Sequence, residues 1–241
     1  MLIVVCGMHR SGSTLTYQLT SQMLDDRIDL RHLSGGLGKT LDDMRSYAAS
    51  DQVYLAKTHV PTRLFRQALP EVGAKYIYTY RDVRDAIASL WRKGKLPAGH
   101  ADRGPESAAR LVNRELLAGT AFRRMPSLFE ARYEDFVADT TDMISSLARF
   151  LDVALMPGEL ERLREETSLE RQRDRVKQLA GSERDLSTRI TPRHITDARV
   201  GAWWHTLTVA EVQAIEHAAE QWLTQHDYRL AISSTAGHPP A

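Results

Sequence analysis

The sequence predicts an α/β fold: a parallel β-sheet flanked by helices, arranged as a P-loop-containing three-layer sandwich. Short apolar runs alternate along the chain with segments of helical periodicity, which is typical of parallel sheets covered on both faces. A glycine-bearing turn joins the first apolar run to the first helical segment, as in α/β proteins that bind phosphate groups. Hydrophobic residues make up 42% of the chain and charged residues 26%, which is typical of a globular protein.

Each expected element follows from periodicity and from the residues that interrupt it. Short runs rich in β-branched and aromatic residues predict strands over residues 2–6, 53–57, 75–80 and 129–133. Helical spacing predicts helices over residues 13–24, 62–69, 84–93, 107–123, 141–151, 157–166 and 209–226. Glycine, proline and polar residues predict irregular segments over residues 31–40, 94–105 and 181–201. Because ligands bind on loops beyond the carboxyl ends of parallel strands, these segments are candidate substrate walls, or plain connections.

Length and composition limit the possible classes of protein. We expect a single domain over residues 1–241, with a lid-like segment at about 181–201. The formal net charge of +1 argues against a nucleic-acid partner. The single cysteine, Cys6, lies in the first apolar run, where we expect a small buried side chain. Without a signal peptide or an apolar run of about 20 residues, we expect a cytoplasmic location and no transmembrane segment. The chain is also compatible with being a domain of a longer protein.

The first candidate site is the turn after the first strand. Gly7 and Gly12 have the spacing of a P-loop, whose backbone N–H groups and helix N-terminus bind phosphate. Ser13 follows Gly12, where ATP and GTP enzymes carry the lysine that reaches the β- and γ-phosphates. The turn is therefore predicted to hold a phosphate group without ordinary nucleoside triphosphate chemistry.

Two further motifs follow predicted strands. In Lys57-Thr-His59-Val-Pro61, a histidine beside a phosphate loop can accept a proton, and the lysine can stabilise a transferring anion. Arg81 ends the third predicted strand, and Ser89 lies eight residues later on the following helix. An arginine fork and a hydroxyl placed in this way can converge on one phosphate.

Two charged residues of the motif that contains Arg81 and Ser89 are expected to have no part in binding. Arg84 and Asp85 lie between Arg81 and Ser89. Charged residues on a helix are mostly exposed, so we expect both to be surface charges that contribute little to stability.

Together the motifs resemble those of the sulfotransferases that use 3'-phosphoadenosine-5'-phosphosulfate (PAPS), of a short bacterial type with a P-loop sulfotransferase fold. Residues 9–14 are similar to the family's 5'-phosphosulfate loop, with Arg10 as its basic residue and His9 where proline is usual. Arg81 and Ser89 resemble its 3'-phosphate motif, and the segment with Lys57 and His59 resembles the one that carries its catalytic base.

Two later segments resemble the family more weakly. Tyr133 begins a Tyr-Glu-Asp segment, whose tyrosine lies near the adenosine in that family. Arg199-Val-Gly201-Ala-Trp203 resembles the late segment that closes over the 3'-phosphate. The chain departs from the family at residues 196–198, which read Thr-Asp-Ala where Arg-Lys-Gly is common. The phosphate contact is therefore expected from Arg199 or a neighbour.

The resemblance implies transfer of a sulfonate group from PAPS to a hydroxyl or amine, leaving adenosine 3',5'-diphosphate, with no metal required. The implied acceptor is a small molecule, a glycan or a lipid, and a homodimer is compatible with the family. The implied catalytic residues are His59 as base, with Arg10 and Lys57. The implied cofactor-binding residues are Arg10, Ser11, Gly12, Ser13, Thr14, Arg81, Ser89, Tyr133, Arg199 and Gly201.

Two alternatives remain open from the sequence. The first is a P-loop nucleotide-dependent kinase, against which Ser13 argues. The second is a non-catalytic nucleotide-binding module, against which His59 and Arg10 argue. The identity of the acceptor is also open.

Overall fold

The computed structural model describes residues 1–25, 27–33, 40–59, 71–94, 102–179, 185, 188–191, 195 and 198–231. The chain divides into two compact units. The first consists of Met1–Arg81 with Ala118–Ala198, and the second of Asp82–Leu117 with Arg199–Ala241.

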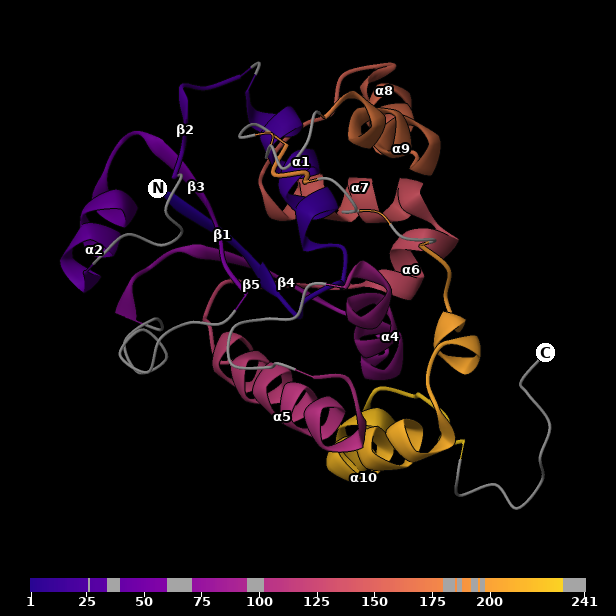
Figure 1. The fold of residues 1–241 in the computed structure, drawn as a ribbon. Helices are drawn as coiled ribbons and strands as arrows, with labels where there is room; N and C mark the ends of the chain where they lie inside the picture. The colour runs from indigo at the N-terminus through magenta and orange to yellow at the C-terminus, as the bar shows by residue number, and fades with distance from the viewer. Residues whose placement is uncertain are drawn as a thin grey trace. The chain divides into compact units, whose positions relative to one another are not determined.

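The first unit contains a five-stranded sheet in the order β2-β3-β1-β4-β5, in which every neighbouring pair is parallel (Figure 1). The strands are β1 (Leu2–Gly7), β2 (Leu30–His32), β3 (Val53–Lys57), β4 (Lys75–Tyr80) and β5 (Leu128–Arg132). The predicted parallel α/β architecture is therefore confirmed. The edge strand β2 was not expected, because it has three residues and two of them, Arg31 and His32, are exposed and polar.

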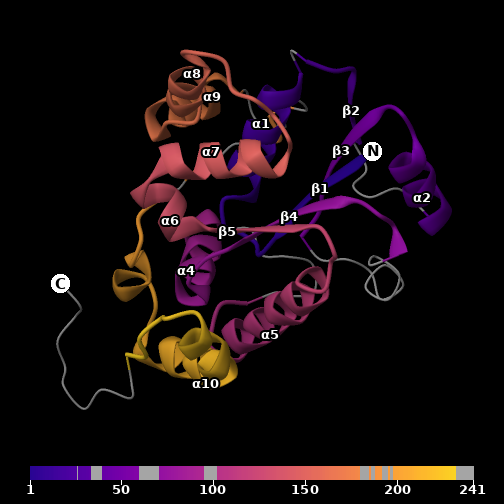
Figure 2. The same cartoon turned by 180° about the vertical axis from the view of Figure 1, so that it is seen from behind.

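Helices on both faces make this unit a three-layer structure. They are α1 (Ser13–Leu24), α2 (Leu41–Ala49), α6 (Tyr133–Ala138), α7 (Thr140–Phe150), α8 (Glu159–Glu166) and α9 (Leu169–Gln178). Helix α8 packs against α7 (Figure 2). The bounds of α1 agree with the sequence, whereas α2, α6 and α9 lie outside the helices predicted from helical spacing. Each of these three buries a single side chain, so it has no apolar stripe to give a periodic signal.

The alternation of side chains along β1 divides the core of the first unit. Ile3 and Val5 point to a cluster with Tyr17 of α1 and Ile144 of α7. Leu2, Val4 and Cys6 point to the opposite cluster, which includes Met44 of α2 and Phe122 of α5 (Pro105–Phe122). All six residues of β1 are buried, which explains why this strand is a continuous apolar run. Burial also raises the pKa of the Cys6 thiol, as expected for a cysteine that packs as a small apolar side chain.

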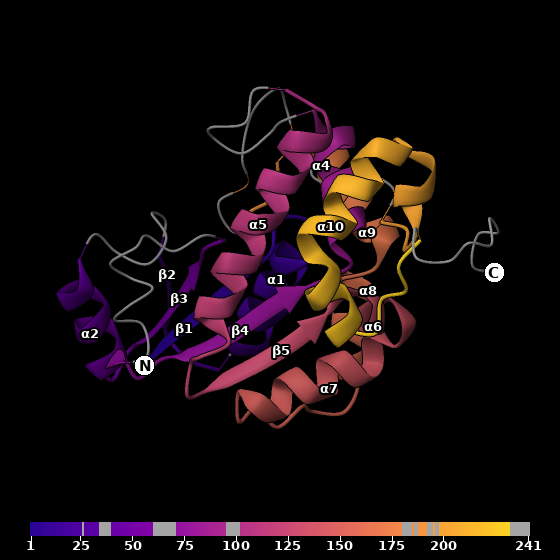
Figure 3. The same cartoon turned by 90° about the horizontal axis from the view of Figure 1, so that it is seen from below.

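The second unit is helical. It contains α4 (Val83–Lys93), the first part of α5, the short helix η2 (Ala202–His205) and α10 (Val209–Gln225). Helix α10 packs against α4 (Figure 3). Ala88 of α4, Trp203 of η2 and Val212 of α10 form its apolar cluster. The bounds of α4, α5 and α10 agree with the predicted helices to within two residues.

Several expectations are not tested by the structure. The helix expected over residues 62–69, and most of the lid-like segment at 181–201, lie outside the described residues. The expectation of one domain stays a prediction. Across the ranges given above, no helix has both the length and the apolar character needed to cross a membrane.

Gly7 lies in close contact with Thr79 of β4. Its φ is +148°, and a Cβ built on it would lie 2.2 Å from Thr79 Oγ1 and 2.3 Å from the Thr79 carbonyl oxygen. We expect Gly7→Ala to lower the free energy of unfolding by about 3 kcal/mol or more, because backbone strain and steric overlap add. Urea denaturation measures this change. Gly73→Ala is the matched control, with φ +66° and no atom of the described residues within 4 Å of the added Cβ. Equal losses for the two variants would contradict the role of the close approach.

Candidate functional site

The loop between β1 and α1 is held in a strained and tightly bonded conformation. Arg10 and Gly12 have φ values of 68° and 88°, in the left-handed region. The Oγ atom of Ser11 lies 2.7 Å from the Met8 carbonyl oxygen and 2.6 Å from Thr79 Oγ1. The Met8 N–H donates to the Thr79 carbonyl oxygen at 3.0 Å. The Ser11 hydroxyl therefore braces the loop against β4, and a ligand in the loop would meet the backbone of this residue.

The loop leads into a helix N-terminus suited to an anion. Gly12 is the N-cap of α1, and among the described residues no side chain caps this helix or places an acid in its first turn. Ser13 and Thr14 are buried at this turn. The first N–H groups of a helix have no partner within it, and the helix dipole adds partial positive charge there. This end of α1 can therefore bind a phosphate-like group.

Arg81 and Tyr133 lie against the same loop. The Arg81 guanidinium lies 4.2 Å from the centroid of the Tyr133 ring, and Arg81 is buried. A Cβ on Gly12 would lie 3.0 Å from Tyr133 Cδ2, so the ring packs directly on the loop. The Tyr133 hydroxyl donates to the Ala198 carbonyl oxygen at 2.9 Å, which fixes the ring. The carboxyl ends of β1, β4 and β5 thus gather a phosphate-type loop, a buried cation and an aromatic ring.

His59 is bonded to the loop and to Lys57. Its Nδ1 lies 3.0 Å from the Gly7 carbonyl oxygen, and its Nε2 lies 2.9 Å from Lys57 Nζ. A carbonyl oxygen can only accept, so Nδ1 carries the proton and donates to Gly7. In the neutral ring, Nε2 then holds the lone pair that accepts from Lys57. The ring of His9 stacks on His59 with centroids 4.1 Å apart and 21° between the planes.

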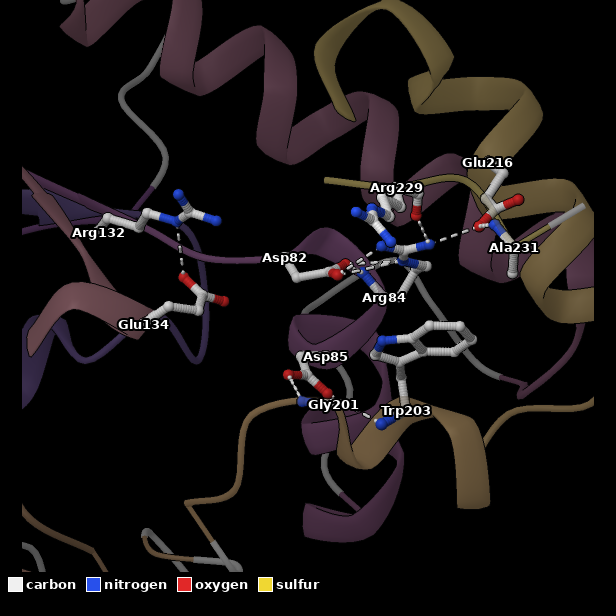
Figure 4. A network of polar contacts seen from close by, with 10 residues as sticks. All are labelled: Asp82, Arg84, Asp85, Arg132, Glu134, Gly201, Trp203, Glu216, Arg229 and Ala231. Carbon is white, nitrogen blue, oxygen red and sulfur yellow. Dashed lines mark hydrogen bonds and ion pairs between the residues drawn. The ribbon is translucent and has the colours of Figure 1, made fainter. Parts of the chain in front are cut away.

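Arg84 and Asp85 are buried, with exposed fractions of 3% and 0%, so the expectation of surface charges was wrong. Arg84 donates to Asp82 and Glu216 at 2.7 and 2.6 Å, and it lies over the Trp203 ring at 4.4 Å (Figure 4). Burial by itself would lower the pKa of Arg84, but the bonds to the two carboxylates raise it above its ordinary value. A buried charge is tolerated when it is paired in this way.

Asp85 holds the late segment of the chain on α4. Its carboxylate accepts from the Gly201 N–H at 2.8 Å and from the Trp203 N–H at 2.9 Å (Figure 4). Ser89 is buried on the same helix, one turn after Asp85, and residues four apart share a helix face. The segment that contains the exposed Arg199 is therefore anchored beside Ser89. Sequence reasoning missed Asp85, although its spacing of four residues before Ser89 was a usable signal.

The predicted site residues divide between the two units. In the first unit the structure brings together Arg10, Ser11, Gly12, Ser13, Thr14, Lys57, His59, Arg81 and Tyr133 at the carboxyl ends of the strands. In the second unit lie Ser89, Arg199 and Gly201. The N–H of Gly201 is already bonded to Asp85. Residues 196 and 197 lie outside the described part of the chain.

Comparison with known proteins gives the family. A family model described as "Sulfotransferase domain" matches residues 2–227. The chain therefore belongs to the sulfotransferase domain family, which confirms the resemblance found in the sequence.

Among curated proteins, sulfotransferase 1C2 of the rabbit Oryctolagus cuniculus is 24% identical over 175 residues, covering 67% of this chain and 59% of the relative. Human sulfotransferase 4A1 is 30% identical over 122 residues, covering 46% and 43%. The chain thus spans about half the length of the curated relatives it matches.

Solved structures show the same fold. The crystal structure of mouse sulfotransferase SULT7A1 complexed with PAP matches with a TM-score of 0.69 and 13% identity, covering 94% of this chain and 84% of that one. Retinol dehydratase in complex with retinol and PAP matches with a TM-score of 0.62 and 17% identity, covering 95% and 82%. At these identities the likeness confirms the predicted fold.

The buried charges around α4 give a stability prediction. Arg84→Met leaves two buried carboxylates without their cation, so we expect the free energy of unfolding to fall by about 3–5 kcal/mol. Urea denaturation of the full chain measures the loss. Arg110→Met is the control, because Arg110 is 62% exposed and its ion pair in the described part of the chain is with exposed Glu106. That variant should change stability by about 0.5 kcal/mol or less. An Arg84 variant as stable as the control would mean that the network does not hold this unit together.

Proposed function

We propose that this protein transfers a sulfonate group from PAPS to a hydroxyl or amine of an acceptor molecule, with His59 as the base. One observation carries the proposal: the ring of His59 is hydrogen-bonded, through Nδ1, to the loop that can bind a phosphate-like group. The proton acceptor is thus bonded directly to the segment that can bind an anion. Membership of the sulfotransferase family, and the PAP bound in the solved relatives, support PAPS as the donor.

The residues present fit a nucleotide that carries phosphate groups. When bound, PAPS supplies the sulfonate group that is transferred. The N–H groups at residues 12–14 and the half-buried Arg10 would hold its 5'-phosphosulfate side, because they place positive charge at the start of α1. Arg81 would bind the 3'-phosphate, and Tyr133 would lie near the adenosine. The cofactor-binding roles of Ser11, Ser89, Arg199 and Gly201 stay predictions of the sequence.

The chemistry needs a base and cations that oppose developing negative charge. His59 Nε2 is the basic atom, because Nδ1 is committed to the Gly7 carbonyl oxygen. In this structure Lys57 donates to Nε2, so an acceptor hydroxyl would take the place of Lys57 and pass its proton to Nε2. The displaced ammonium group can then stabilise the transferring anion together with Arg10. No step requires a metal ion.

The proposed acceptor is a small molecule, a glycan or a lipid that carries a hydroxyl or an amine. Small molecules with a hydroxyl group are the first to test, because retinol and androsterone are bound in structures of retinol dehydratase. Glycans and lipids follow. A cytoplasmic location and a homodimer stay predictions.

The donor is tested by calorimetric titration with adenosine 3',5'-diphosphate in metal-free buffer, against Mg·ATP. We expect tight binding of the bisphosphate and none of ATP. Arg81→Ala should weaken binding of the bisphosphate by about 10- to 100-fold, because a charge-assisted hydrogen bond is lost. The same variant should bind adenosine 5'-phosphate almost as well as the wild type does. Preference for Mg·ATP would contradict the proposal and favour a P-loop kinase. Equal losses of affinity for the two nucleotides in the Arg81 variant would show that Arg81 does not bind the 3'-phosphate.

The base is tested by His59→Ala. We expect the rate of sulfonate transfer to a panel of hydroxylated acceptors to fall by about 10²- to 10⁴-fold, because general-base catalysis is lost. Binding of adenosine 3',5'-diphosphate should be nearly unchanged. His217→Ala, on the exposed face of α10, is the matched control. A wild-type rate in the His59 variant would place the base elsewhere, at His32 or a carboxylate.

A further inference from the structure

His9 makes a contact that is explained neither by anion binding in the loop between β1 and α1 nor by proton transfer to His59. Its ring stacks on the ring of His59, with centroids 4.1 Å apart and planes inclined by 21°. His9 lies in the loop between β1 and α1, directly before Arg10, and is half-buried. It stands where proline is usual in the family that the sequence resembles. The stack therefore involves a position at which this sequence departs from the usual pattern of that family.

The geometry around His59 shows what the stack adds. The two hydrogen bonds, from Nδ1 to the Gly7 carbonyl oxygen and from Lys57 to Nε2, both lie at the edge of the ring. These two contacts define an axis through the ring, and by themselves they would allow the ring plane to tilt about this axis. A flat group against the face of the ring removes that freedom. His9 supplies such a group from the loop that also supplies the Gly7 carbonyl.

We propose that His9 is a positioning residue for His59. His9 fixes the plane of the His59 ring, and the Gly7 carbonyl oxygen fixes its tautomer, with the proton on Nδ1 and the lone pair on Nε2. The importance of this for catalysis rests on the proposed role of His59 as base. The structural part of the proposal, one ring plane and one tautomer, is independent of that role.

As a consequence, the His59 ring keeps a fixed position relative to the anion-binding loop between β1 and α1. Both groups that orient His59 from the loop, His9 and Gly7, are within five residues of the N-cap Gly12. Thr79 holds this loop against β4 through Ser11 and Met8. The direction of Nε2 is therefore set relative to the bound anion. Small errors in such alignment reduce rates strongly, by up to about 10²-fold for a displacement of about 1 Å.

The tautomer can be measured on the ligand-free full chain. Long-range ¹H–¹⁵N correlation spectra of protein labelled with ¹⁵N-histidine report which ring nitrogen carries the proton, and His59→Gln assigns the His59 signals. We expect wild-type His59 to be the Nδ1–H form. His9→Ala should give a second His59 tautomer or averaged signals, whereas His9→Phe, which keeps a flat ring, should retain the wild-type pattern. His217→Ala should leave the signals unchanged.

Each result bears on the proposal. A wild-type His59 protonated at Nε2, or His59 signals unaffected by His9→Ala, would overturn it. A His9→Phe variant that behaves like His9→Ala would show that stacking is not the cause and would also overturn it. If His9→Ala does not fold, His9→Asn provides the non-stacking variant.

Activity separates this proposal from the proposed function. With an acceptor found in the panel, His9→Ala should lower kcat by about 10-fold or more with little change in the affinity for adenosine 3',5'-diphosphate, and His9→Phe should restore kcat. Failure of the wild type to bind the bisphosphate would overturn the proposed function and leave the tautomer result standing. Normal binding with a His59 ring insensitive to His9 would overturn only the positioning role.

Discussion

The site depends on the contact between the loop after β1 and Thr79 of β4. Gly7 has no side chain, so β1 can approach Thr79 to a distance that no Cβ could occupy. Met8 and Ser11 then bond to Thr79 and close the loop over the end of β4. The contact positions three things at once. The N-terminus of α1 points out of the loop, the Gly7 carbonyl faces His59, and Arg81 follows Thr79 by two residues along the chain.

The parallel sheet explains why polar groups from distant parts of the sequence lie in one region. Parallel strands bring their carboxyl ends to one edge of a sheet, so the ends of β1, β3, β4 and β5 deliver the loop, Lys57, Arg81 and Tyr133 to the same region. Within that region the loop contributes backbone groups, and the other strands contribute side chains. Arg10, Lys57 and Arg81 place positive charge there, which suits a ligand that carries several negative charges.

The sequence predicted the layers of the first unit and the placement of its motifs, because both depend on local patterns. The continuous apolar run of β1 and the glycine spacing after it are visible without tertiary information. The edge strand β2 was missed because two of its three residues are exposed and polar. The burial of Arg84 could not be predicted in this way, because its partner Glu216 lies 132 residues further along the chain. The bracing role of the Ser11 hydroxyl was missed for the same reason, since Thr79 lies 68 residues away.

In the second unit, the segment from Asp82 to Ser89 has a structural task besides its proposed chemical one. Asp82 and Arg84 form a buried ionic group with Glu216, and Asp85 accepts two backbone N–H groups of the late segment. A carboxylate with two such bonds holds the backbone at Gly201 and Trp203 in one conformation, because each lost bond would leave a buried polar group unsatisfied. Position 85 is thus constrained by the fold, and Ser89, which the proposed function assigns to the cofactor, lies one turn later on the same helix. The motif spacing is therefore explained by helix geometry as well as by the proposed binding of a phosphate group.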